Sequence, residues 1–152
     1  MNAVAEKLIP STGWRVSLAM LIVRVAVGIG FVLHGMPKLA HPLSWDSGHG
    51  GLPGVPGWLQ LIVVLAETVG GWCVVFGFLT PLFAFLQTCD MIVVTFVIKM
   101  AHGLPYVGPQ GRSYEVEAHL LAGALVLLLC GPGAYSLDAA IKAMAARRAR
   151  FS

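Results

Sequence analysis

Four long runs of apolar residues limit what this chain can fold into. The runs cover residues 17–36, 58–79, 82–101 and 115–130. A helix needs about 20 residues to cross the hydrocarbon core of a bilayer, and these runs approach or reach that length. Because lipid offers no hydrogen-bond partners to the backbone, such segments must satisfy their own polar groups as helices. We therefore expect an all-α integral membrane protein built on a four-transmembrane-helix bundle.

The amino-acid composition indicates the same class of protein. Hydrophobic residues make up 57% of the 152 residues and charged residues 11%, whereas soluble domains contain about 25% charged residues. The mean hydropathy is +0.81. The segments between the runs are short and rich in Gly and Pro, so they cannot build a second core. We expect a single transmembrane domain over residues 1–152.

The basic residues predict how the chain sits in the membrane. The formal charge is +3, but the basic residues flank the apolar runs, so we expect no nucleic-acid partner. Six lie near the termini and three in or beside the first and third loops: Lys7, Arg15, Lys142, Arg147, Arg148 and Arg150 against Lys38, Lys99 and Arg112. The positive-inside rule then predicts that both termini face the cytoplasm.

A last, shorter helix is expected at about residues 137–150, after a Gly-Pro-Gly break at residues 131–133. Ser136 is suited to cap its first turn. Leu137, Ile141 and Met144 share one face of this helix, and the basic residues avoid that face. The pattern is typical of an amphipathic helix at the membrane interface, here on the cytoplasmic leaflet.

Two charged residues lie deep within the predicted spans. At about 1.5 Å per residue, Arg24 and Asp90 come to similar depths, about 10 and 12 Å from the cytoplasmic face. A charge in lipid is costly unless it is paired or hydrated. We therefore expect a structural ion pair between Arg24 and Asp90 that locks the first helix to the third, with a proton relay as the alternative.

A second group of polar residues gathers near the opposite face of the membrane. His34 and Lys38 share a face of the first helix, and Glu67 lies on the second helix beside small residues. On the fourth helix, Glu115 and His119 are one turn apart on one face, and Glu117 is expected to point away. We expect His34, Lys38, Glu67, Glu115 and His119 to line one cofactor-binding pocket that opens outward.

Three interpretations of this group stay open at this point. It could be a hydrogen-bonded polar core that fixes helix register. It could be a metal site, but the Glu-x-x-x-His spacing differs from the Glu-x-x-His of di-iron bundles, so we expect no metal. It could be a pocket for a redox-active ligand, since His and Lys beside a carboxylate suit the hydrogen bonding and proton exchange of a quinone head group.

Three segments of the chain resemble the DoxX family. They read RVAVGIGFVLHGMPKL in the first helix, AETVGGWCVVFGFLTP in the second, and YEVEAHLLAGALVLLLCGPGAYSLD at the end. The resemblance implies a four-helix protein of a bacterial or archaeal inner membrane, in a family named after a subunit of a thiosulfate:quinone oxidoreductase. It also implies functional positions at Arg24, His34, Lys38 and Glu67, with Glu115 in place of the fourth-helix acid.

These observations predict a membrane anchor and quinone-interacting subunit of a redox complex. Besides membrane lipids, the expected partners are protein subunits of that complex or further copies of this chain. No flavin, haem-attachment or iron–sulfur motif is present, so electrons would have to come from a partner, and whether the chain is itself an enzyme stays open. The alternative is a non-enzymatic scaffold or a small-solute or proton transporter, which four short helices without a visible internal repeat do not favour.

Overall fold

The protein is entirely helical over the residues that its structure, a computed structural model, describes: 13–45, 55–109 and 112–149. The elements are α2 (Trp14–Gly35), the 3₁₀ segment η1 (Met36–Ala40), α3 (Gly57–Phe76), α4 (Thr80–Ile92), the π-helical segment η2 (Val93–Met100), α5 (Glu115–Cys130) and α6 (Leu137–Arg148). All four apolar runs form helices, as predicted. η1 continues α2, and η2 continues α4.

Three helices are long and apolar enough to cross a membrane: Trp14–Ala40, Gly57–Phe76 and Thr80–Met100, with 27, 20 and 21 residues. α5 begins and ends where the fourth span was predicted, but it has only 16 residues. That is shorter than the roughly 20 residues of a typical span. The fourth crossing therefore stays a prediction, while three candidate spans are shown by length and composition.

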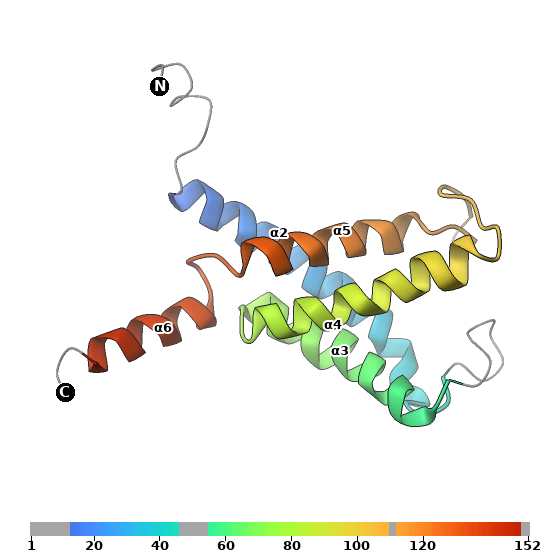
Figure 1. The fold of residues 1–152 in the computed structure, drawn as a ribbon, viewed down its shortest axis with the longest axis horizontal. Coiled ribbons are helices and arrows are strands. Elements are labelled where there is room, and N and C mark those ends of the chain that lie inside the picture. Colours follow the sequence, from blue (N-terminus) through green and yellow to red (C-terminus); the bar gives the residue numbers. More distant parts are fainter. Residues whose placement is uncertain (1–12, 46–54, 110–111, 150–152) are drawn as a thin grey trace, which may run out of the picture.

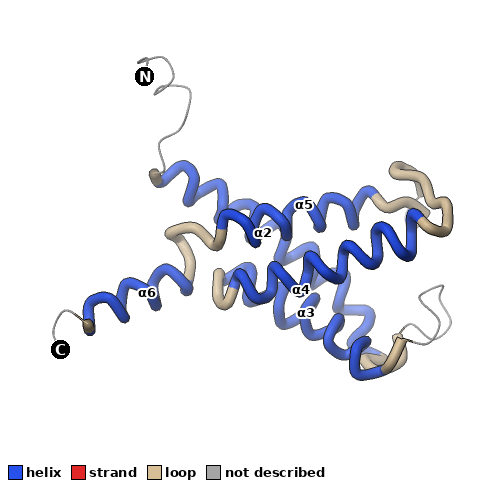
Figure 2. Tube along the Cα trace, viewed as in Figure 1, coloured by secondary structure: helices blue, strands red, loops and turns tan. Residues whose placement is uncertain are grey.

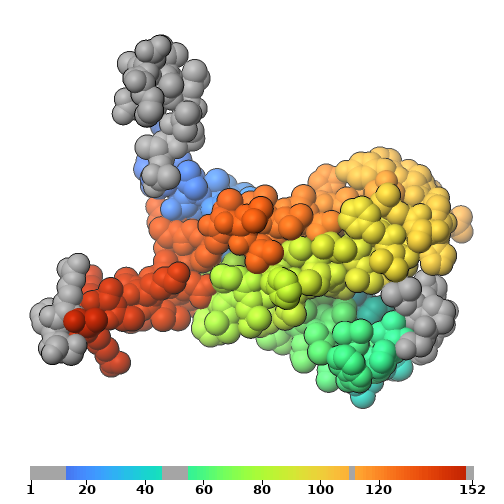
Figure 3. Space-filling view, viewed as in Figure 1, coloured from blue at the N-terminus to red at the C-terminus, as the bar shows by residue number. Residues whose placement is uncertain are grey.

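The four long helices run up and down side by side, and α6 points away from one end of them (Figure 1). α2 packs mainly against α3 and α5, and α4 also packs mainly against α3 and α5. The turns after α3 and α5 lie at the end from which α6 leaves, and the C-terminal ends of η1 and η2 lie at the other end (Figure 2). The space-filling view shows α6 standing clear of the bundle (Figure 3).

Small residues bring α2 and α3 into close contact. A Cβ atom at Gly28 would lie 2.7 Å from the carbonyl oxygen of Gly71, and one at Gly71 would lie 2.8 Å from that of Gly28. Both distances are far below van der Waals contact, so only glycine fits at either position. Close backbone packing of this kind drives helix association where lipid removes the usual hydrophobic driving force.

Arg24 attaches the C-terminal part of the chain to the bundle. It is only 2% exposed, and its guanidinium group donates to the carbonyl oxygens of Val75 at 3.2 Å, Pro132 at 2.8 Å and Tyr135 at 2.6 Å. The latter two carbonyls follow α5, where a helix end leaves acceptors unsatisfied. Gly77 makes room for this contact, because its φ is +70° and a side chain there would collide with Arg24.

The start of α6 is capped as the sequence predicted. The Ser136 hydroxyl oxygen accepts from the amide of Ala139 at 3.1 Å. In the first turn of α6, the Asp138 carboxylate accepts from the amides of Leu79 at 2.9 Å and Thr80 at 3.0 Å, which are free donors at the start of α4. Asp138 therefore ties α6 to the turn between α3 and α4.

The predicted ion pair between Arg24 and Asp90 is not formed. Arg24 contacts the end of α3 through Val75, and the carboxylate that acts on it electrostatically is Asp138. Asp90 lies ten residues beyond Thr80, the first residue of α4, which corresponds to about 15 Å along the helix. Arg24 lies ten residues into α2 but is level with the turn that precedes α4, because α2 begins farther out on this side than α4 does. Counting from the predicted helix starts therefore placed the two residues at the same depth.

Replacing Arg24 should therefore destabilise the protein without involving Asp90. Arg24→Leu leaves three carbonyl oxygens without their donor, and we expect a loss of about 3 kcal/mol in the free energy of unfolding. Thermal melting of the purified protein in detergent measures it. Arg15→Leu, on the exposed start of α2, is the matched control and should change little. If Asp90→Leu restored the stability of Arg24→Leu, the two residues would be partners after all.

Candidate functional site

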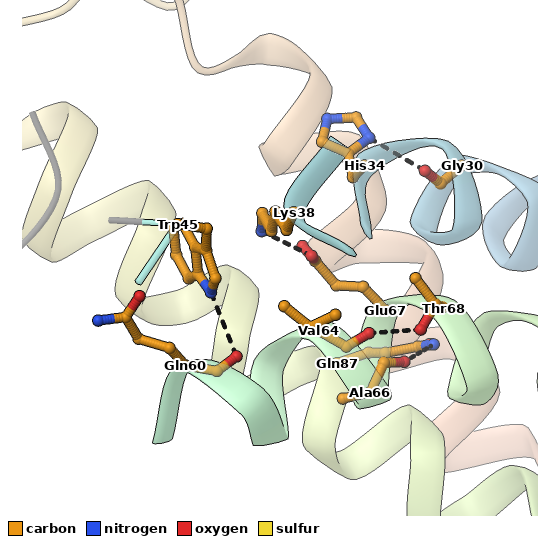
Figure 4. A network of polar contacts seen from close by, with 10 residues as sticks. All are labelled: Gly30, His34, Lys38, Trp45, Gln60, Val64, Ala66, Glu67, Thr68 and Gln87. Atoms are coloured by element: carbon orange, nitrogen blue, oxygen red, sulfur yellow. Dashed lines mark hydrogen bonds and ion pairs between the residues drawn. The ribbon is translucent and has the colours of Figure 1, made fainter. Parts of the chain in front are cut away.

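A buried ion pair joins η1 to α3. Lys38 Nζ lies 2.6 Å from Glu67 Oε2. Glu67 is fully buried at 0% exposure. Lys38 Nζ also lies 4.4 Å from the centroid of the Trp45 ring, within the range of a cation–π contact. The ammonium group is thus held between the Trp45 ring and the Glu67 carboxylate (Figure 4).

The neighbouring side chains hold this pair in position. The indole N–H of Trp45 donates to the carbonyl oxygen of Gln60 at 3.2 Å, which fixes the ring over Lys38. Gln87 of α4 donates to the carbonyl oxygen of Ala66 at 3.1 Å and so links α4 to α3 beside Glu67. Pro37, near the start of η1, cannot continue the regular hydrogen bonding of α2. The chain therefore tightens there and presents Lys38 to α3.

A second carboxyl group joins this pair. Asp90 of α4 lies within hydrogen-bonding reach of Glu67 and close to Lys38. Asp90 Oδ2 is buried and has no hydrogen-bond partner, and neither has Glu67 Oε1. Two carboxyl groups from two helices therefore lie near one ammonium group, which is paired with Glu67. We call Lys38, Glu67 and Asp90 the three-residue cluster.

An apolar cavity of about 240 Å³ opens beside the three-residue cluster. Its walls come from α3, α4 and η2, with Trp45 on one side: Trp45, Val55, Leu59, Ile62, Val63, Ala66, Leu86, Cys89, Asp90, Val93, Val94 and Ile98. Asp90 is the one charged residue among these walls. The cavity is slightly smaller than typical small-molecule sites, whose volumes begin at about 300 Å³.

A second buried ion pair lies between η2 and α5. Lys99 Nζ is 2.6 Å from Glu117 Oε1 and donates to the carbonyl oxygen of Ser113 at 2.7 Å. The expectation that Glu117 points away was therefore wrong, since Glu117 is only 7% exposed and faces η2. Glu115 is half-buried and His119 is exposed. α5 is apolar around its whole circumference, so its sequence does not indicate which acid faces the bundle.

Of the five residues predicted to share a pocket, the structure brings Lys38 and Glu67 into contact. His34 Nδ1 lies 3.0 Å from the carbonyl oxygen of Gly30, one turn back in α2, and its ring points away from the Lys38–Glu67 pair (Figure 4). His119 likewise contacts the carbonyl oxygen of Glu115 and lies beside the Tyr106 ring. Among the described residues, no three His, Cys, Asp or Glu side chains are placed to hold a metal ion.

The chain contains a short sequence repeat at the two lysines that form these ion pairs. KLAHPL begins at Lys38 and KMAHGL begins at Lys99. Each lysine lies in the last turn of a non-α segment that extends the first helix of a hairpin. Each also pairs at 2.6 Å with a glutamate of the following helix. The expectation of no visible repeat was thus wrong, and this signal could have identified Lys99 and Glu117.

The helix packing agrees with this repeat. α2 with α3 and α4 with α5 form the two hairpins, and each first helix also packs against the second helix of the other hairpin. If the two hairpins exchanged places, each helix would therefore still pack against the same kinds of neighbour. Similar repeats of the same orientation occur in other membrane proteins.

The fold and site define an α-helical membrane protein whose helices are joined by buried ion pairs. The chain belongs to the DoxX family, whose family model matches residues 19–100. It is 28% identical to the "Inner membrane protein YqjF" of Escherichia coli over 80% of this chain and 90% of that protein. It is 26% identical to the "Uncharacterized membrane protein Rv3486" of Mycobacterium tuberculosis, over 79% of each chain. It is also 26% identical to the "Putative oxidoreductase CatD" of Bacillus subtilis, over 80% of this chain and 85% of that protein. No solved structure matches it.

Two neighbouring acids of α5 should differ sharply in their effect on stability. Glu117→Ala leaves the Lys99 ammonium group buried without its partner, and we expect a loss of about 3 kcal/mol in the free energy of unfolding. Glu115→Ala removes a half-buried side chain with no ion pair and should cost about 0.5 kcal/mol or less. Melting curves of the two variants in the same detergent compare them directly. Equal losses would contradict the orientation of α5 described above.

Proposed function

We propose that this protein is a membrane subunit of a redox complex and that it binds a quinone-type ligand in the cavity between α3, α4 and η2. The observation that supports this proposal is the cavity itself, whose apolar walls contain one carboxyl group, that of Asp90. The Bacillus subtilis relative carries the name "Putative oxidoreductase CatD", which agrees with such a role. The electrons come from a partner subunit.

The side chains around the cavity fit the chemistry of a quinone. Apolar walls suit its ring and hydrocarbon tail, and the Trp45 ring offers a surface for stacking. The buried, unpartnered Asp90 Oδ2 can hydrogen-bond to an oxygen of the head group. The ligand would supply the electron-transfer chemistry, and the protein would supply binding, orientation and a proton-exchanging group.

The transporter alternative also has one observation in its favour. Many transporters are built from internal repeats, and this chain contains two similar hairpins. A transporter of solutes or protons would move its substrate across the membrane of a sealed vesicle without any electron donor. The two functions therefore differ in a measurable way. The redox subunit binds a ligand in the cavity and transports nothing, whereas the transporter moves protons or solutes across the membrane.

We also propose that α5 is the fourth span and that α6 lies on the cytoplasmic surface. α5 packs against α2 and α4, which belong to candidate spans, so it shares their environment. Its 16 residues cover about 24 Å, and local thinning of the bilayer accommodates such a short helix. Lys142, Arg147 and Arg148 on α6 suit the anionic cytoplasmic leaflet of the inner membrane.

A ligand titration tests the proposed cavity. A short-chain quinone added to the protein in nanodiscs should quench tryptophan fluorescence in a saturable way. Asp90→Leu should weaken its binding about tenfold, the effect of losing one hydrogen bond of about 1.4 kcal/mol. Val63→Phe, which fills the cavity from α3, should weaken it further.

His119→Ala is the control for this titration, since His119 is exposed on α5. It should bind the quinone as the wild type does. If His119→Ala weakened binding while Asp90→Leu and Val63→Phe did not, the ligand would occupy the outward pocket predicted from the sequence. Without saturable quenching in the wild type, the quinone proposal would be wrong, and proton or solute flux in proteoliposomes would favour the transporter.

The proposed topology places both ends of the chain in the cytoplasm. Alkaline phosphatase fused after Ser152 should be inactive, because that enzyme works only in the periplasm, and a fluorescent protein fused at the same place should fold. A phosphatase fusion in the connection after η2, at Gly108, should be active. The opposite result at Ser152 would mean that α5 does not cross the membrane or that the orientation is reversed.

A further inference from the structure

The two buried Lys–Glu pairs have the same geometry but different charge. Both have an N–O distance of 2.6 Å. The Lys99–Glu117 pair balances one positive charge with one negative charge. The three-residue cluster contains one lysine, Lys38, and two carboxyl groups, Glu67 and Asp90. With both carboxyl groups ionised, it would carry a net negative charge inside the bundle.

No second cation is available to balance this charge among the residues that the structure describes. Glu67 is fully buried, and the charged groups that act on Asp90 are Glu67 and Lys38. Arg24, in the middle of α2, is engaged with three carbonyl oxygens, and Lys99 is paired with Glu117. His34, on the facing helix, is turned toward the backbone of Gly30. An unbalanced charge in this environment is strongly unfavourable.

The contact between the two carboxyl groups indicates how the extra negative charge is balanced. Ionised carboxylates have acceptors only, so Glu67 and Asp90 at hydrogen-bonding reach would repel each other. A single proton converts this repulsion into a hydrogen bond, as it does in other carboxyl pairs that share a site. The proton also gives a role to the carboxyl oxygens Glu67 Oε1 and Asp90 Oδ2, which are buried without a hydrogen-bond partner.

We propose that Glu67 and Asp90 hold one proton between them, so that the three-residue cluster forms a neutral proton-binding site at the wall of the cavity. The proton comes from water, and no bond other than O–H is made or broken. Asp90 faces the cavity, whereas Glu67 is sealed behind it. A proton on this pair can therefore pass through Asp90 to an oxygen atom of a bound molecule, or to water that enters the cavity.

This inference deepens the proposed quinone site but does not depend on a bound quinone. The proton balances the charge of the protein itself, and the site is therefore occupied in protein without ligand. A quinone or another carbonyl compound in the cavity would meet a carboxylic acid there, which donates a hydrogen bond, and not a carboxylate, which would repel its oxygen atoms.

Infrared spectroscopy of the purified protein at neutral pH, without added ligand, tests the inference. A protonated carboxyl group gives a C=O stretching band that ionised carboxylates lack, and this band shifts when H₂O is replaced by D₂O. We expect one such band in the wild type. It should disappear in both Asp90→Asn and Glu67→Gln, because each variant leaves a single carboxylate to balance Lys38.

Glu117→Gln is the matched control, because Glu117 is also buried and paired with a lysine but has no second carboxyl group beside it in the described part of the chain. Its spectrum should keep the band. The absence of a deuterium-sensitive band in the wild type would overturn the proposal, and so would its survival in both Asp90→Asn and Glu67→Gln. If sodium but not potassium stabilised a band-free wild type, a bound cation would balance the charge in place of the proton. Failure of the quinone titration alone leaves the infrared result unchanged, so the two proposals fail separately.

Discussion

The cost of an unbalanced charge inside a membrane determines how this bundle is assembled. Lys38, Lys99 and Arg24 each lie where lipid or protein surrounds them, and each is satisfied by groups on a different element. Removing one partner of such a buried contact costs about 3–5 kcal/mol. Each contact therefore fixes the rotation of a helix about its own axis. Apolar packing alone would define this rotation less strictly. The ion pairs join η1 to α3 and η2 to α5, and Arg24 joins α2 to the start of the C-terminal segment.

The helices could be predicted from the sequence because their signal is local. A long apolar run must be helical in lipid, and the structure confirms helices at all four predicted runs. The choice of partners could not be predicted in the same way. Glu115 and Glu117 are both possible inward residues of a helix that is apolar around its circumference, and only the position of Lys99 on a neighbouring element decides between them.

The misplaced partner of Arg24 has a related cause. A carboxylate was the expected partner, because acidic residues can be recognised in a sequence and unsatisfied backbone acceptors cannot. In the structure, Arg24 uses carbonyl oxygens that helix ends and turns leave unsatisfied. Two of those acceptors, Pro132 and Tyr135, become available only after the chain has broken its helix at Gly131–Gly133 and turned back toward α2. A buried arginine that can reach the ends of neighbouring helices is therefore weak evidence for an acidic partner.

Comparison of the two repeated hairpins distinguishes the structural role of the ion pairs from the functional role of the site. Both hairpins have a Lys–Glu pair, so helix assembly accounts for both. Assembly does not account for Asp90, which adds an acid to one pair and has no counterpart beside Glu117 among the described residues. It also does not account for the cavity, which lies on the side of Asp90. A carboxyl group beside one of two otherwise similar ion pairs calls for a role that the other position lacks, and the proposed binding or proton exchange at the cavity would supply that role.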